Sequence, residues 1–238
     1  MTKIKNSTVL ITGADGGIGT ALLNEFLLRK AKKIYVTGLK KEGLLKLQEK
    51  SPDIIEPLVM DVTNFENIKQ CANICSDVNI LINNAGVELK IPFTSKDASK
   101  AASFEMNVNY IGIIEIINQF TPILSKNKNS AIINIMSLAS VVIIKRLATY
   151  CASKAATHIL TNAIRDELGE KNIKVIGVYP GYVNTAMLPE EVPYKKSEPC
   201  EIATAICNGL EKGEENIFPD DMSKNYFAKN PIRINYIE

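Results

Sequence analysis

A chain of 238 residues with 46% hydrophobic and 23% charged residues has the composition of an average globular protein and can bury a core without disulfides or metals. This composition excludes a disordered chain, a coiled coil and a collagen-like fibre, and a net charge of +2 is too balanced for a nucleic-acid-binding protein. The longest apolar runs, 111–117 and 138–144, are far shorter than the ~20 residues of a membrane span. Without a signal-peptide pattern at its start, the chain is expected to be cytoplasmic, with no membrane partner. The five Cys form no C-x-x-C pair and there is one His, so no metal site is expected.

Short apolar runs alternate with longer segments of helical periodicity along the chain. In chain order we expect strand 8–12, helix 20–30, strand 33–37, helix 42–50, a strand ending at Met60, helix 64–75, strand 78–82, helix 103–124, strand 131–136, helix 150–168, strand 174–179, helix 199–212 and strand 216–218. The polar tail from Pro219 is expected to be irregular. Strands that alternate with helices form parallel sheets, and fully apolar strands indicate that helices cover both faces. The sequence therefore predicts one α/β domain over residues 1–238, doubly wound around a mostly parallel sheet of seven strands.

A glycine-rich loop, Gly13–Gly19, connects the first strand to the first helix. Glycines let a backbone turn tightly and approach a pyrophosphate, while the following helix offers free N–H groups and a partial positive charge. A plain strand-to-helix turn would look similar, so the loop alone is weak evidence. Asp15 places a negative charge near that anion, and its side chain is expected to point outward or to cap the helix.

Six motifs in order resemble the short-chain dehydrogenase/reductase family over about residues 5–220. They are Gly13, Gly17 and Gly19; Asn83-Asn84-Ala85-Gly86; Asn109-x-x-Gly112; Ser137; Tyr150-Cys-Ala-Ser-Lys154; and Pro180-Gly181-Tyr182-Val183-Asn184-Thr185. The resemblance implies a Rossmann fold and an oxidoreductase that uses a nicotinamide cofactor.

The residues near the middle of the chain suit acid–base chemistry. Tyr150 and Lys154 lie four apart, so on a helix they share one face, and Ser137 follows a strand whose end faces the ligand crevice. A nearby ammonium would lower the pKa of a phenol from its ordinary value of ~10, which makes Tyr150 a candidate general acid and base. Ser137 could hold the substrate oxygen. The resemblance assigns Lys154 to the nicotinamide ribose and Asn109 to a proton relay. A surface Tyr and Lys is the alternative interpretation of the pair taken alone.

The motif match also gives the expected cofactor contacts. These are Gly13, Asp15, Gly17, Ile18, Gly19, Leu39, Lys40, Asp61, Val62, Asn84, Ala85, Gly86, Tyr150, Lys154, Pro180, Gly181, Val183 and Thr185. Leu39 stands where NAD-selective sheets carry an acid, and Lys40 and Lys41 follow, so NADP(H) is expected to be favoured over NAD(H). Against this preference, Asp15-Gly16 lacks the basic residue found in many NADP-binding relatives. The resemblance places Asp61-Val62 at the adenine of the cofactor. The alternative is that Asp61 only stands at the start of a helix, or that Thr63 caps it.

The substrate is expected to be a small carbonyl compound or alcohol. The apolar run 138–144, together with Val87, Leu89, Tyr182 and Met187, could line an apolar pocket or could pack in a core or subunit contact. His158 is expected to pack rather than to catalyse. The resemblance implies a homodimer or homotetramer through helices 103–124 and 150–168. Two other functions remain open: a non-catalytic NADP-binding regulator, and a lyase or epimerase on the same scaffold.

Overall fold

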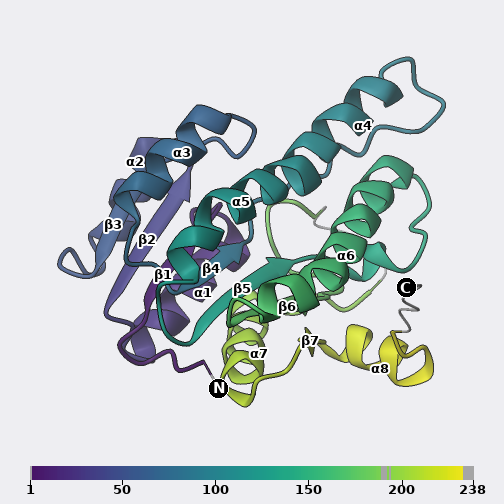
Figure 1. Cartoon of the computed structure of the whole chain (residues 1–238). Coiled ribbons are helices and arrows are strands. Elements are labelled where there is room, and N and C mark those ends of the chain that lie inside the picture. Colours follow the sequence, from purple (N-terminus) through teal and green to yellow (C-terminus); the bar gives the residue numbers. More distant parts are fainter. Residues whose placement is uncertain (1, 189–191, 193, 233–238) are drawn as a thin grey trace.

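The computed structural model describes residues 2–188, 192 and 194–232, and within them the strands form one parallel sheet of seven strands in the order β3-β2-β1-β4-β5-β6-β7 (Figure 1). The strands are β1 (Thr8–Ile11), β2 (Lys33–Gly38), β3 (Ile55–Val59), β4 (Ile80–Asn83), β5 (Ser130–Ile135), β6 (Ile173–Val178) and β7 (Asn216–Ile217). Every neighbouring pair is parallel, which confirms the predicted fold class. The strand order reverses between β1 and β4, and ligands bind at such a point, beyond the carboxyl ends of the strands.

Helices cover both faces of the sheet because successive strand side chains point to opposite faces. They are α1 (Gly17–Leu28), α2 (Lys41–Gln48), α3 (Phe65–Ile74), α4 (Ala98–Met106), α5 (Gly112–Leu124), α6 (Ala148–Gly169), α7 (Pro199–Lys212) and α8 (Asp221–Lys229). In β1, Val9 and Ile11 pack with α1, α2 and α7, whereas Leu10 packs with α3, α5 and α6. These two clusters form the core. No helix in the described part of the chain has the length and apolar character needed to cross a membrane.

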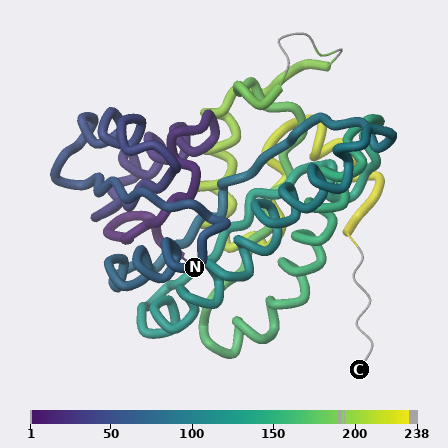
Figure 2. Tube along the Cα trace, turned by 90° about the horizontal axis from the view of Figure 1, so that it is seen from above, coloured from purple at the N-terminus to yellow at the C-terminus, as the bar shows by residue number. Residues whose placement is uncertain are grey.

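The long predicted helix 103–124 is instead a composite of three helical segments. It begins earlier, at Ala98, and a π-helical turn, Asn107–Ile111, joins α4 to α5. Seen from above in Figure 2, the purple and blue first half of the chain lies mainly on one side and the green and yellow half on the other. The α4 segment crosses this division and contacts α6. It thereby brings residues that follow β4 next to the helix that carries Tyr150.

The prediction of an irregular tail from Pro219 is wrong. Asp220 caps α8 by accepting a hydrogen bond from the Ser223 N–H at 2.8 Å. Phe227 then packs against Tyr179 and Phe218, with ring centroids 5.1 and 4.2 Å away. Burial of this one aromatic side chain, 6% exposed, gives a short polar helix its tertiary support.

Candidate active site

A cleft of about 1180 Å³ opens at the carboxyl ends of the strands. Typical small-molecule pockets measure ~300–1,000 Å³, so this cleft has room for a dinucleotide and a second small molecule. Of the expected cofactor contacts, its wall contains Gly13, Asp15, Gly17, Ile18, Leu39, Lys40, Asp61, Val62, Asn84, Ala85, Gly86, Tyr150, Lys154, Pro180, Gly181, Val183 and Thr185. Gly19 lies beneath the loop, outside the lining.

At Gly13, Gly17 and Gly19 the loop leaves no space for a Cβ, which fits a backbone cradle for phosphates. Gly13 has a φ of +60°, a conformation that favours glycine. A Cβ on Gly17 would lie 2.6 Å from the Thr185 Cγ2, and one on Gly19 would lie 2.3 Å from the Gly13 carbonyl oxygen. The amino end of α1 therefore faces the cleft with free backbone N–H groups, a suitable place for a pyrophosphate.

Thr12 joins this loop to the motif after β4, a role that the sequence analysis did not assign. The Thr12 hydroxyl accepts hydrogen bonds from the N–H groups of Asn84 and Ala85, each at 2.9 Å. The Asn84 amide in turn donates to the carbonyl oxygens of Thr12 and Gly13 at 2.8 and 2.9 Å. The two strand ends beside the switch point are thus held as one unit.

The far end of the cleft contains the residues predicted to surround the adenosine. Leu39 is 68% exposed at the end of β2, and Lys40 lies beside it. The Asp61 carboxylate accepts from the N–H and hydroxyl of Thr63 at 2.8 and 2.7 Å. The cap of α3 is Asn64 rather than Asp61 or Thr63. Asp61 therefore lines the cleft without acting as that helix cap.

Ser137, Tyr150 and Lys154 meet at the middle of the cleft. Ser137 follows β5, and its hydroxyl accepts from the Ala139 N–H at 3.1 Å, at the start of the short 3₁₀ helix Leu138–Ser140. Tyr150 and Lys154 lie in the first two turns of α6 and are 7% and 4% exposed. The Lys154 ammonium lies 5.9 Å from the Tyr150 ring centroid and donates to the Ile135 carbonyl oxygen at 3.0 Å.

Burial governs the acidity of both α6 residues. It raises the pKa of the Tyr150 phenol, nearby Glu88 raises it further, and a hydrogen bond with Ser137 works in the opposite direction. Burial also lowers the pKa of Lys154 from 10.5 to about 8. The sequence led us to expect that the Lys154 ammonium lowers the pKa of Tyr150. Among the protein's own groups, burial has the larger effect and raises that pKa.

Asn109 lies in the π-helical turn, fully buried behind the cleft rather than in its lining. Its amide donates to the Val87 carbonyl oxygen and the Ser153 hydroxyl, and its carbonyl oxygen accepts from the Val87 N–H, all at 2.9 Å. Asn109 thus connects the segment after β4 to α6, next to Lys154. Gly86 lies between them: a Cβ there would be 3.2 Å from the Asn109 oxygen and 3.4 Å from the Lys154 nitrogen.

Two buried acids near Tyr150 were missed by the sequence analysis. The Glu88 side chain is 6% exposed, lines the cleft and lies 3.8 Å from Lys90. Burial raises the pKa of Glu88, while Lys90 opposes this and Glu105 adds to it. Glu105 is fully buried; one of its oxygens accepts from the Leu89 N–H at 2.8 Å, and the other has no partner among the described residues. No residue pattern could reveal this pair, because the acids come from a loop and from α4.

Most of the apolar residues expected to line a pocket do line the cleft. The lining includes Leu138, Val142, Ile143, Ile144, Val87, Tyr182 and Met187. Leu89 is absent from the described lining, since its backbone turns toward Glu105. Lys90 donates to the Met187 carbonyl oxygen and so connects two walls of the cleft. On the opposite side, the Gly181 N–H donates to Asp220 at 2.7 Å, which anchors residues 180–183 to α8.

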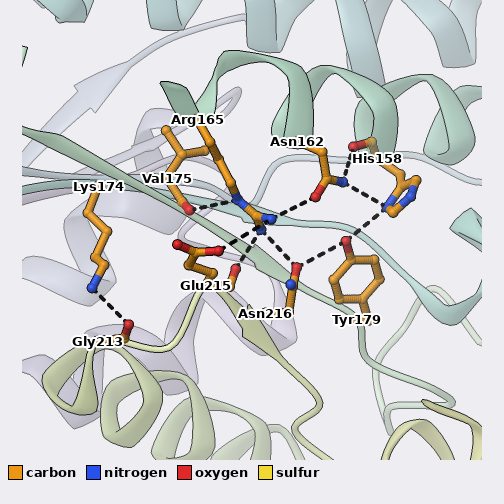
Figure 3. Close-up of polar contacts among 9 residues, drawn as sticks. All are labelled: His158, Asn162, Arg165, Lys174, Val175, Tyr179, Gly213, Glu215 and Asn216. Carbon is orange, nitrogen blue, oxygen red and sulfur yellow. Dashed lines mark hydrogen bonds and ion pairs between the residues drawn. The ribbon is translucent and has the colours of Figure 1, made fainter. Parts of the chain in front are cut away.

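His158 packs away from the cleft, at the edge of the sheet shown in Figure 3. Its Nδ1 lies 2.8 Å from the Tyr179 hydroxyl, and burial lowers its pKa. The neighbouring Arg165 donates to the side chains of Asn162 and Asn216 at 2.7 and 2.8 Å. Arg165 also donates to the Val175 carbonyl oxygen, so this network holds α6 on β6 and on the start of β7. Among the described residues no group of acids, His or Cys could hold a metal ion.

Comparisons with known proteins agree with this geometry. The family model for short chain dehydrogenases matches residues 7–196. An uncharacterized oxidoreductase from Staphylococcus aureus strain USA300 is 30% identical across 98% of this chain and all of the relative, and another from Staphylococcus saprophyticus is 28% identical over the same shares.

Solved structures show the same fold. A short chain dehydrogenase from Burkholderia cenocepacia in complex with NADP is 34% identical, with a TM-score of 0.88 over 95% of this chain and 93% of that one. A short-chain dehydrogenase from Sphingobium yanoikuyae in complex with NADPH is 22% identical, with a TM-score of 0.82 over 98% of both chains. With its parallel sheet, glycine loop and extended family match, this chain belongs to the short-chain dehydrogenase/reductase family.

Proposed function

We propose that this oxidoreductase moves a hydride between a nicotinamide and the carbon of a carbonyl or alcohol, with Tyr150 as the general acid and base. The observation that carries the proposal is the placement of Tyr150, buried in the cleft wall with Ser137 and Lys154 beside it. A bound nicotinamide supplies or accepts the hydride.

The residues of this chain then handle the proton and the orientation. Tyr150 donates its hydroxyl proton to the oxygen of a carbonyl that is being reduced, and it takes that proton back in the oxidation direction. Ser137 donates a hydrogen bond to the same oxygen. Lys154 holds the nicotinamide ribose and stabilises the phenolate of Tyr150 with its positive charge. Asn109 keeps the surrounding backbone in register for the proton relay.

NADP(H) is the proposed preferred cofactor. The end of β2 has no carboxylate of its own, because Gly38 and Leu39 occupy it, and Lys40 lies in the lining there. A lysine at this place can attract a 2′-phosphate. The Burkholderia relative, 34% identical, was solved in complex with NADP.

The apolar residues of the second half of the cleft support a small substrate that is mainly apolar. We further propose that one domain carries the cofactor and substrate sites, and that the protein works in the cytoplasm, where its unpaired cysteines remain reduced. A homodimer or homotetramer would cover the exposed apolar side chains of α4 to α6, among them Phe104 at 46% and Ile159 at 61% exposure.

A panel of aldehydes, ketones and alcohols, followed by nicotinamide absorbance, tests the activity. Tyr150→Phe should lower turnover by ~10²–10⁴-fold while the affinity for cofactor stays the same. Tyr226→Phe is the matched control, since Tyr226 lies on α8 outside the lining. Full activity of Tyr150→Phe would refute the assignment of the proton donor. Tight cofactor binding without turnover of any compound would favour the regulator instead.

A further inference from the structure

The carboxylate of Asp15 occupies the end of β2, although Asp15 belongs to the glycine loop. A Cβ built on Gly38 would lie 2.8 Å from the Asp15 Oδ1 and 3.3 Å from its Oδ2. A Cβ on Gly43, in α2, would lie 3.4 Å from the same Oδ2. The carboxylate therefore fills the space that a side chain at position 38 would take.

Backbone hydrogen bonds hold the glycine loop beside β2. The Ala14 N–H donates to the Thr37 carbonyl oxygen at 2.9 Å, which joins the loop to β2 one residue before Asp15. The Thr20 hydroxyl holds the Ala14 carbonyl oxygen at 3.0 Å from the other side. Asp15 neither caps α1, whose cap is Gly16, nor points away from the cleft. The sequence-based expectation of an outward or capping side chain is thus replaced by a third arrangement.

This place has a defined role in dinucleotide-binding sheets. An acid about twenty residues after the glycine loop accepts a hydrogen bond from the 2′-hydroxyl of the adenosine ribose, and a cation there accommodates a 2′-phosphate instead. In this chain Gly38 and Leu39 stand at the end of β2, and neither is an acid. Asp15 is exposed and has no hydrogen-bond or ion-pair partner among the described residues, so its oxygens are free to accept.

We propose that Asp15 reduces the preference for NADP(H) over NAD(H). Its carboxylate takes the position that the side chain of an acid at the end of β2 would have. Its carboxylate accepts a charge-assisted hydrogen bond from the 2′-hydroxyl of NAD(H) and repels the 2′-phosphate of NADP(H). Lys40, on the same part of the lining, acts in the opposite direction. The inference rests on the proposed cofactor site, and it predicts that the two residues change the affinity ratio in opposite directions.

The test measures dissociation constants of NADPH and NADH by nicotinamide fluorescence, without substrate. Asp15→Asn keeps the shape and removes the charge, so it should tighten NADPH about tenfold and weaken NADH severalfold. Lys40→Met should weaken NADPH about tenfold and leave NADH unchanged. Glu42→Gln removes a negative charge from the first turn of α2, but Glu42 is 85% exposed, lies outside the cleft lining and faces Lys46 at 3.3 Å, so both affinities should stay within about twofold.

The possible outcomes separate this inference from the proposed function. An affinity ratio in Asp15→Asn within about twofold of the wild type, with both nucleotides still bound, would overturn the role of Asp15 alone. If Glu42→Gln changed the affinity ratio as much as Asp15→Asn does, the role of Asp15 would also be overturned. The effect would then come from the overall negative charge near the cleft and not from a contact of Asp15 with the cofactor. Failure of the wild-type protein to bind either nucleotide would refute both the cofactor site and this inference.

Discussion

Replacing Lys154 by methionine should stabilise the protein at neutral pH, although it removes a residue of the proposed site. Methionine has a similar length and no charge, so it can remain in the space that Lys154 occupies at 4% exposure. Burial lowers the pKa of Lys154 from 10.5 to about 8, which means that the folded protein disfavours the charged form. At about 1.4 kcal/mol per pKa unit, this disfavour amounts to about 3 kcal/mol of unfolding free energy.

The cost of burying the Lys154 charge depends on pH. Below about pH 8 lysine is charged in both the folded and the unfolded chain, so the full cost of burying the charge is present. Between about pH 8 and 10.5 the folded protein loses the proton first, and the unfolded chain binds more protons. Stability of the wild type therefore rises with pH in this window, relative to the methionine variant.

The methionine variant also loses the hydrogen bond that Lys154 donates to the Ile135 carbonyl oxygen. Its loss costs about 1 kcal/mol. Lys154→Met should therefore be about 2 kcal/mol more stable than the wild type at pH 7, and this advantage should largely disappear by pH 10. For a chain of this size the gain corresponds to roughly 4–8 °C in Tm.

Urea unfolding of both proteins at pH 7 and pH 10 measures the difference directly, since the other titrating groups are common to both. Turnover should be lost in the variant at both pH values. If Lys154→Met were less stable than the wild type at pH 7, or if the stability difference were the same at the two pH values, the burial argument would be refuted.

Three further substitutions test the charge next to Tyr150 and the packing at two helical glycines. Glu88→Gln removes a negative charge that raises the pKa of Tyr150, so in the oxidation direction the rise of activity with pH should move to lower pH; an unchanged pH–rate profile would contradict this. Gly112→Ala places a Cβ 2.5 Å from the Val62 carbonyl oxygen and should lower the free energy of unfolding by roughly 1–3 kcal/mol. Gly169→Ala, where no atom lies within 4 Å of the new Cβ, should instead stabilise by roughly 0.5–1 kcal/mol, and equal effects of both changes in a denaturant titration would rule out the proposed clash.

The alternation of apolar strands and periodic helices was sufficient to predict the parallel sheet. It failed where tertiary contacts decide the local structure. The α8 segment has few apolar residues, and it becomes helical because Phe227 is buried against Tyr179 and Phe218. The π-helical turn Asn107–Ile111 adds a residue to one turn, and apolar spacing in a window of this length does not distinguish it from regular helix.

The spacing Asn109-x-x-Gly112 has a physical explanation that only the structure supplies. The π-helical turn directs Asn109 toward Val87, and Gly112 then allows α5 to approach the backbone at Val62. Val62 lies in the cleft where the adenosine is expected. The motif is recognisable in the sequence, but the contacts that it serves come from segments far away in the chain. The same holds for Asp15 and for the acids Glu88 and Glu105, because the direction of a side chain depends on packing.

The central side chains are held by backbone atoms more than by one another. Ser137 accepts from the Ala139 N–H, Lys154 donates to the Ile135 carbonyl oxygen, and Asn109 binds both backbone groups of Val87. Backbone atoms at the ends of β4 and β5 keep their positions when side chains elsewhere in the cleft are exchanged. Residues 142–144 and 186–188, which line the cleft, contribute none of these bonds. Substitutions there can therefore change which carbonyl compound fits while the proposed proton donor keeps its geometry, so substrate range and chemistry are separable in this fold.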